Sequence, residues 1–244
     1  MPKVFFVFLS LLISANLFAQ ENIYDILGMD MVDTSDYDGK LMFYEELPFN
    51  LLNKAEVDKK IASDVEHAKN QHFKTLGDVN AYLAKNKTTE YQKIRAFFVW
   101  IEHHIEFDTH SYLTNHVPPQ HPLVIYQSKK ALSKGFADLF TIFCQNNDIE
   151  CRTLKGYTKG FDPAKERKDY PDHYWNVVRI DNYWYLLDIP MCMGKIEAKQ
   201  FVKGYNENFF LSPPLEFVKT HLPIHASWQL LEAHVSLEDF YNQK

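Results

Sequence analysis

Residues 173–188 read HYWNVVRIDNYWYLLD, in which two runs of β-branched and aromatic residues flank Asp181-Asn182. Runs of this composition are typical of β-strands. The Asp-Asn pair between them favours a two-residue hairpin loop. The stretch therefore predicts an antiparallel hairpin.

The register of this hairpin determines which side chains share a face. With a two-residue loop, Ile180 pairs with Tyr183, and Asp188 falls opposite Trp175. His173 then lies diagonal to Asp188 on the same face, within reach of a histidine–carboxylate hydrogen bond. An aspartate in this position would fix the tautomer of the imidazole and stabilise its protonated form.

A buried helix is predicted earlier in the chain. It begins at Ser133 and carries an apolar stripe at helical spacing, made of Phe136, Leu139, Phe140, Phe143 and Cys144. The unpaired N–H groups and the dipole at a helix N-terminus favour a nucleophile or a developing oxyanion. Ser133 occupies that position, although serine is also a favoured helix N-cap.

The remaining pattern predicts helices first and strands afterwards, which indicates an α+β fold. Helices are expected after the N-cap residues Thr75 and Thr89, followed by a proline-containing loop over 109–128 and a strand over 150–158. We expect one domain over 75–244. Residues 20–74 are mostly polar and are interpreted as an N-terminal arm or linker with a charged helix near 55–69.

The N-terminus has the pattern of a signal peptide. Lys3 precedes an apolar run over 4–13, and Ala19 offers a cleavage position. The run is short for a bilayer span, which favours a cleaved segment 1–19 over a retained membrane anchor. We therefore expect an exported protein, periplasmic or extracellular, with no membrane segment after cleavage.

Composition excludes some functions. The 244 residues are enough for one sizeable core, and the net charge of −6 argues against nucleic acid as a partner. Eleven histidines form no recognisable ligand frame, so neither a metal nor another cofactor is predicted. Three cysteines are too few for a disulfide scaffold, and the sequence leaves open whether Cys144 and Cys151 pair.

Several motifs together carry a family resemblance. Residues 131–137 read ALSKGFA, where transglutaminase-like domains have Gly-Val-Cys-Glu-Gly-Tyr-Ala, and residues 173–176 read HYWN, where they have His-Ala-Trp-Asn. Asp188 follows a Trp-Tyr pair, as the aspartate of the family does. The stretches 205–211 and 221–223 are similar to the kyphoscoliosis-peptidase branch. The chain thus resembles transglutaminase-like domains of the kyphoscoliosis-peptidase type.

The resemblance implies a papain-like fold, with a central helix packed on an antiparallel sheet. In active members it implies a Cys–His–Asp triad for acyl transfer or peptide hydrolysis. His173 and Asp188 match two triad positions directly, whereas Ser133 stands in the place of the nucleophilic cysteine. Cys192 offers another thiol, but without a helix N-terminus behind it we interpret it as a loop or core residue.

Three functions follow from this pattern. The first is a non-catalytic homologue, a pseudoenzyme that binds a polypeptide or cell-wall peptide in a papain-like cleft. The second is a peptidase or acyltransferase with a Ser133–His173–Asp188 triad. The third is a scaffold whose arm, residues 20–74, docks on another protein. The pattern sets neither the ligand nor the oligomeric state.

Overall fold

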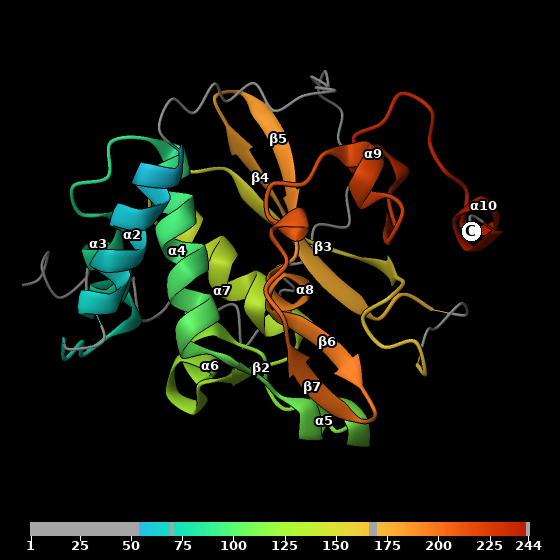
Figure 1. Cartoon of the computed structure of the whole chain (residues 1–244), viewed down its shortest axis with the longest axis horizontal. Coiled ribbons are helices and arrows are strands. Elements are labelled where there is room, and N and C mark those ends of the chain that lie inside the picture. The colour runs from blue at the N-terminus through green and yellow to red at the C-terminus, as the bar shows by residue number, and fades with distance from the viewer. Residues whose placement is uncertain (1–53, 69–70, 166–169, 243–244) are drawn as a thin grey trace, which may run out of the picture. The chain divides into compact units, whose positions relative to one another are not determined.

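The computed structural model describes residues 54–68, 71–165 and 170–242 (Figure 1). The predicted signal peptide and the first part of the predicted arm, up to residue 53, lie outside the described residues. Within the described ranges, no helix combines the length and apolar character needed to span a bilayer.

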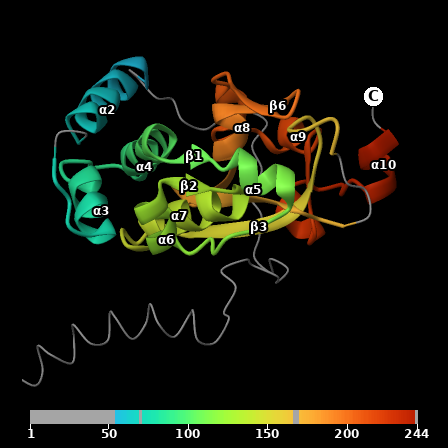
Figure 2. The ribbon, with the colours of Figure 1, turned by 90° about the horizontal axis from the view of Figure 1, so that it is seen from below.

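The centre of the fold is a four-stranded antiparallel sheet with the order β5-β4-β3-β8. Its strands are β3 (Cys151–Thr158), β4 (His173–Ile180), β5 (Tyr183–Leu187) and β8 (His221–Pro223). Helix α7 (Ser133–Gln145) packs on β3 and β4, and Figure 2 shows it beside β3. The predicted α+β class, with a central helix on an antiparallel sheet, is confirmed.

The β4–β5 hairpin has the predicted register. Ile180 pairs with Tyr183 and Asn176 pairs with Leu187. The φ angles of Asp181 and Asn182 are 49° and 71°, and two successive positive values define the tight turn that matches the twist of a hairpin.

The described part of the chain begins with the helices α2 (Lys54–Ala68), α3 (Leu76–Ala84) and α4 (Glu90–His104). Thr75 and Thr89 each form a capping box, with Asp78 and Gln92 respectively, as the sequence pattern predicts. The predicted charged helix near 55–69 is α2. Its Ile61 and Val65 are buried in the same core as α4, so the described part of the predicted arm packs on the domain.

The stretch predicted as a loop over 109–128 contains two short helices, α5 (Thr109–Thr114) and α6 (Pro122–Ser128). Proline is compatible with the first turn of a helix, where its missing N–H costs nothing, and Pro122 begins α6. Asp108 caps α5 by accepting a hydrogen bond from the Ser111 N–H at 3.1 Å. Short parallel strands β1 (Glu106–Phe107) and β2 (Lys130–Ala131) close this region beside Ser133.

After β5 the chain makes a long excursion before it returns as β8. This excursion contains α8 (Ile189–Met193), β6 (Gly194–Glu197), β7 (Gln200–Lys203), η1 (Glu207–Phe209) and α9 (Pro214–Phe217). The elements η2 (Ala226–Gln229) and α10 (Leu237–Asn242) follow β8. The sheet is consequently buried on both faces: α7 covers one, and a second cluster containing Trp175, Phe217 and Trp228 covers the other.

Candidate functional site

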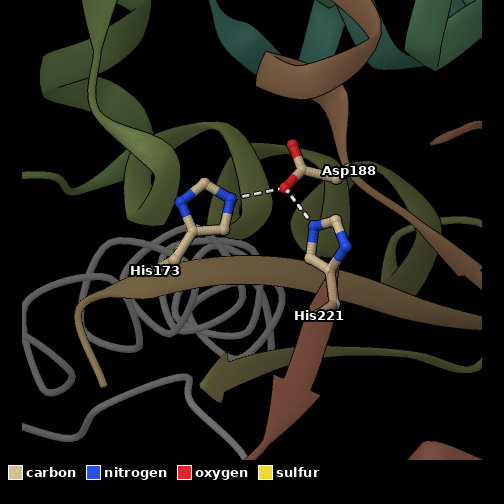
Figure 3. A group of neighbouring side chains, drawn as sticks. All are labelled: His173, Asp188 and His221. Carbon is tan, nitrogen blue, oxygen red and sulfur yellow. Dashed lines mark hydrogen bonds and ion pairs between the residues drawn. The ribbon is translucent and has the colours of Figure 1, made fainter. Parts of the chain in front are cut away.

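Asp188 is the centre of a buried polar cluster. It directly follows β5, caps α8 and is 0% exposed. Its Oδ1 accepts the Met191 N–H at 2.8 Å, and its own N–H donates to the Phe209 carbonyl at 2.9 Å. Its Oδ2 accepts hydrogen bonds from two imidazoles, those of His173 and His221 (Figure 3). A carboxylate with this many donors is held in one orientation.

His173, the first residue of β4, makes the hydrogen bond to Asp188 that the hairpin register predicts. The bond uses Nε2, and the second ring nitrogen points away from Asp188 in Figure 3. Because an ionised carboxylate only accepts, a neutral His173 carries its proton on Nε2 and keeps a lone pair on Nδ1. His173 also lines the pocket that contains Ser133.

Sequence reasoning missed the second histidine. His221 lies on β8, is 1% exposed, and its Nε2 is 3.0 Å from Asp188 Oδ2. Its Nδ1 is 2.8 Å from the hydroxyl of Thr220. The stretch His221-Leu222-Pro223 contributes to the family resemblance, but no local pattern in it predicts that β8 returns to this cluster.

Burial shifts the pKa values of Asp188 and His221, because it disfavours the charged form of each side chain. Burial alone would raise the pKa of Asp188, but the two imidazoles outweigh it and hold this pKa well below its usual value. Burial also lowers the pKa of His221, although the hydrogen bond to Asp188 acts in the opposite direction. We therefore treat Asp188 as an anion and His221 as a neutral donor through Nε2.

Ser133 begins α7 but does not cap it. The N-cap residue is Leu132, and the helix has no side-chain cap hydrogen bond. The interpretation of Ser133 as an N-cap is therefore wrong. Its side chain instead lines the pocket, and among the described residues no hydrogen bond joins Ser133 to His173.

The pocket over Ser133 and His173 has a volume of about 500 Å³. One side comes from α5 and the residues around it, and the other from the end of β3 and the loop after it. The lining residues are Phe107, Ser111, Tyr112, Asn115, Val117, Leu132, Ser133, Thr158, Phe161, Asp162, Lys165, Tyr170, Asp172 and His173. Lys165 joins the two sides, because its Nζ donates to the Tyr112 carbonyl at 2.6 Å and to Asn115 Oδ1 at 2.9 Å.

A metal site is the other arrangement that two histidines and an aspartate suggest. The ligand atoms of His173, Asp188 and His221 all lie within 4.8 Å of one another. However, both Nε2 atoms are hydrogen-bonded to the same carboxylate oxygen, so an ion would have to break both bonds. The side chains of Asp188 and His221 are also 0% exposed, which leaves no open coordination position. The cluster fits a hydrogen-bonded unit better than a metal site.

The three cysteines are free, buried thiols. Burial raises the pKa of the Cys192 thiol well above its usual value, and the nearby Asp188 carboxylate acts in the same direction. This is the opposite of what a thiolate nucleophile needs. Of the histidines between 103 and 121, His103 and His104 bond to carbonyls of their own helix.

Residues 77–189 match the family model of the transglutaminase-like superfamily. The human kyphoscoliosis peptidase is 32% identical over 171 residues, which are 68% of this chain and 26% of that protein. Cytokinesis protein 3 of Schizosaccharomyces pombe is 28% identical over 197 residues, 76% of this chain and 21% of that protein. The chain thus spans about a quarter of the length of these relatives. A crystal structure described as a TGase overlaps 69% of this chain and 39% of its own, with a TM-score of 0.37 and 14% identity.

Proposed function

The chain carries a transglutaminase-like domain of the kyphoscoliosis-peptidase type, and we propose that this domain is a non-catalytic module that binds a polypeptide in the pocket over Ser133. The observation that carries the proposal is the residue at the start of α7. The family places a cysteine there, and this chain has a serine that makes no hydrogen bond to His173.

The replacement matters because the two side chains need different help from the site. A free cysteine has a pKa of about 8.5, and a helix N-terminus with a nearby imidazole lowers it enough to form a thiolate. A serine hydroxyl becomes a nucleophile only when an adjacent base takes its proton through a direct hydrogen bond. Ser133 and His173 line one pocket but lack that bond, so the site keeps its base without an engaged nucleophile.

The size and lining of the pocket are compatible with a peptide segment. Its volume of about 500 Å³ lies in the range of ligand sites, and its walls contain the rings of Phe107, Tyr112 and Phe161. Its lining also includes Ser133 and His173, and a hydroxyl oxygen and a ring-nitrogen lone pair can accept hydrogen bonds from main-chain or side-chain N–H groups. The peptide part of a cell wall offers the same groups, so it belongs to the same class of ligand.

The alternative function is a serine-dependent peptidase or acyltransferase. One observation favours it: Ser133 is not engaged in capping its helix, so its hydroxyl remains available to the pocket. In this case His173 would act as the general base and Asp188 would orient it.

Covalent labelling separates the two functions. The protein is treated with a serine-reactive phosphonate and its intact mass is measured, beside Ser133→Ala and His173→Ala. The non-catalytic module predicts no labelling of the wild type. Labelling that requires both Ser133 and His173 would overturn it and establish the serine enzyme. Ser133→Cys, treated with a thiol reagent, should react only when His173 is intact, which would show that the rest of the site is preserved.

Binding is tested with a random-peptide array. The wild type should retain a subset of peptides, and Ser133→Trp should lose them because an indole would fill the part of the pocket that Ser133 lines. A thermal unfolding curve of Ser133→Trp checks that the fold is intact. Equal retention by the folded Ser133→Trp variant would place binding elsewhere.

Export is a separate part of the proposal, and it rests on the pattern of residues 1–19. N-terminal sequencing of the protein expressed in a bacterium and recovered from the periplasm or medium should begin at Gln20. Recovery of the uncleaved chain from the membrane fraction would favour the retained anchor.

A further inference from the structure

We propose that His221 is a positioning residue for the pocket. It shares Asp188 Oδ2 with His173 and thereby fixes the orientation of the carboxylate. The fixed carboxylate keeps the proton of His173 on Nε2, so that the lone pair on Nδ1 stays available to the ligand. The inference deepens the proposed function, because it concerns the same pocket. Its test measures the tautomer of the His173 ring directly. The proposal about His221 can therefore fail while peptide binding is confirmed, and peptide binding can fail while the role of His221 is confirmed.

The fold brings His221 to Asp188 from a distant part of the chain. β8 pairs with β3 on the side away from β4, with Thr158 opposite His221 and Gly156 opposite Pro223. Gly156 also pairs with His173 on β4. A Cβ atom at Gly156 would lie 2.2 Å from the Leu222 carbonyl oxygen, so the close approach of β8 requires glycine there. The two histidines therefore flank β3 and reach the same oxygen of Asp188 (Figure 3).

The surroundings of His221 are apolar. The ring of Phe217 stacks on it, with centroids 3.9 Å apart and an interplanar angle of 18°. Trp175 and Phe209 approach it edge-on, at 5.1 Å and 5.8 Å between centroids. A phenyl ring would fill this space without needing any polar partner. The imidazole needs two, and it has them in the Thr220 hydroxyl and Asp188.

The two partners of His221 determine which of its ring nitrogens carries the proton. Because the Asp188 carboxylate only accepts, a neutral His221 carries its proton on Nε2. Its Nδ1 is then an acceptor 2.8 Å from the Thr220 hydroxyl, which also lies 3.3 Å from the Phe217 carbonyl. Asp188 Oδ2 then has two donors in fixed directions, while Met191 N–H holds Oδ1. The carboxylate cannot rotate without losing a buried hydrogen bond, and the direction of its bond to His173 is set.

The test compares two replacements of similar size. His221→Phe keeps the stacking on Phe217 but loses the donor, whereas His221→Gln keeps an N–H that can reach Asp188. The first readout is the ¹⁵N NMR spectrum of the His173 ring, which distinguishes the two neutral tautomers. It is recorded on proteins that keep Ser133. We expect one tautomer, protonated on Nε2, in the wild type and His221→Gln, and a mixture in His221→Phe.

The second readout uses Ser133→Cys, in which the rate of thiol alkylation reports how well His173 faces position 133. At metal sites, loss of the partner that orients a histidine typically costs 10–100-fold. The orientation of His173 is at stake here in the same way, so His221→Phe should lower this rate by about 10-fold and His221→Gln by much less. If His221→Phe fails to fold, Thr220→Val provides a milder loosening and should move both readouts in the same direction.

Three results would overturn the proposal. One is an unchanged His173 spectrum and alkylation rate in His221→Phe. Another is an equal loss in His221→Phe and His221→Gln, which would mean that His221 has only a packing role. The third is one equivalent of zinc in the purified wild type, by atomic emission, that is absent in His221→Phe, which would make the cluster a metal site.

Discussion

Gln120 Oε1 accepts the backbone N–H of Leu132 at 2.8 Å, so the stretch before α6 holds the residue that precedes Ser133. The same side chain donates from Nε2 to the Pro118 carbonyl at 3.0 Å and is 8% exposed. The oxygen and the nitrogen of the Gln120 amide are thus both hydrogen-bonded within the protein. This contact joins residues that are 12 apart in the chain and fixes the start of α7. The position of Ser133 in the lining of the pocket depends on it.

Gly135 makes this contact possible, and the first prediction concerns its replacement. A Cβ atom at Gly135 would lie 2.6 Å from Gln120 Oε1 and 2.9 Å from Ile125 Cδ1. Overpacking of this kind costs about 1–3 kcal/mol, which exceeds the gain of about 1 kcal/mol from the better helix propensity of alanine. Gly135→Ala should therefore lower the free energy of unfolding measured in urea, and it should change the alkylation rate of Ser133→Cys.

Gly77→Ala is the matched control, because Gly77 also lies in a helix. The nearest atom to its added Cβ is Thr75 Oγ1 at 3.6 Å, an ordinary contact. This variant should be neutral or stabilised by up to about 1 kcal/mol. Equal effects of the two substitutions would contradict the role given to Gly135.

The second prediction concerns Gly156 and the return of β8. Its added Cβ would lie 2.2 Å from the Leu222 carbonyl oxygen and 2.3 Å from Trp175 Cη2. Neither a strand backbone nor a ring in a packed core can move aside cheaply, so Gly156→Ala should displace β8 and with it His221. We expect a loss of about 2–4 kcal/mol in urea unfolding and the same mixed His173 tautomers as in His221→Phe.

Gly204→Ala serves as the control for Gly156→Ala. Apart from its neighbours in the chain, none of the described residues has an atom within 4 Å of a Cβ built at Gly204, so the stability of Gly204→Ala in urea should stay close to that of the wild type. If Gly156→Ala were as stable as Gly204→Ala, β8 would tolerate a methyl group at position 156, and the prediction would be wrong.

The sequence predicted the local parts of the site well. Asp181-Asn182 determines the hairpin register, and the register alone places His173 beside Asp188. The helix that begins at Ser133 followed from its apolar stripe. These features depend on residues that are close in the chain, where periodicity and turn chemistry carry most of the information.

The parts that the sequence did not predict depend on distant contacts. His221 lies on a strand of three residues, too short for a periodic signal, and it reaches Asp188 only through pairing with β3. Gln120 lies in a proline-containing stretch without periodicity, and nothing local connects it with Leu132. The packing of α2 on α4 likewise depends on which face of a weakly amphipathic helix finds a partner.

The third prediction is an acid-dependent loss of stability that depends on His221. Burial lowers its pKa in the folded protein, so the unfolded chain takes up a proton below about pH 6.5 while the folded protein resists it. The free energy of unfolding therefore falls as the pH drops below that value, by at most about 1.4 kcal/mol per pH unit for one proton. Urea unfolding of His221→Phe should lack this part of the slope.

Asp188 contributes at lower pH in the same experiment. Its folded pKa is depressed, so its contribution is present above its unfolded pKa of about 3.9 and is lost as the pH falls toward the folded value. The wild type and His221→Phe should both show this second loss below about pH 4, and it should be smaller in His221→Phe because one of the two imidazoles that lower the pKa of Asp188 is gone. Identical curves for the two proteins between pH 5 and 6.5 would contradict the buried, neutral state of His221.

The fourth prediction concerns the ion pairs that join α2 to the rest of the domain. Arg95 on α4 is 8% exposed; its Nη2 lies 3.1 Å from Glu207 Oε2, and its Nε lies 3.6 Å from Asp58 Oδ1 on α2. Its guanidinium also lies 4.6 Å from the centroid of the Phe210 ring. Glu207 is two residues before Phe209, whose carbonyl accepts the N–H of Asp188. The ion pairs of Glu207 therefore also help to hold the backbone next to Asp188 in place.

Arg95→Met keeps much of the packing on Phe210 but removes the charge from between two carboxylates. Lys54 still contacts both, at 2.7 Å and 3.2 Å, so the loss is limited to about 2–4 kcal/mol in urea unfolding. Lys219→Met is the comparison, since Lys219 and Glu216 form a pair whose side chains are 59% and 62% exposed. Exposed pairs contribute about 0–1 kcal/mol, so this variant should change little. Equal losses in the two variants would mean that α2 is held by its apolar face alone.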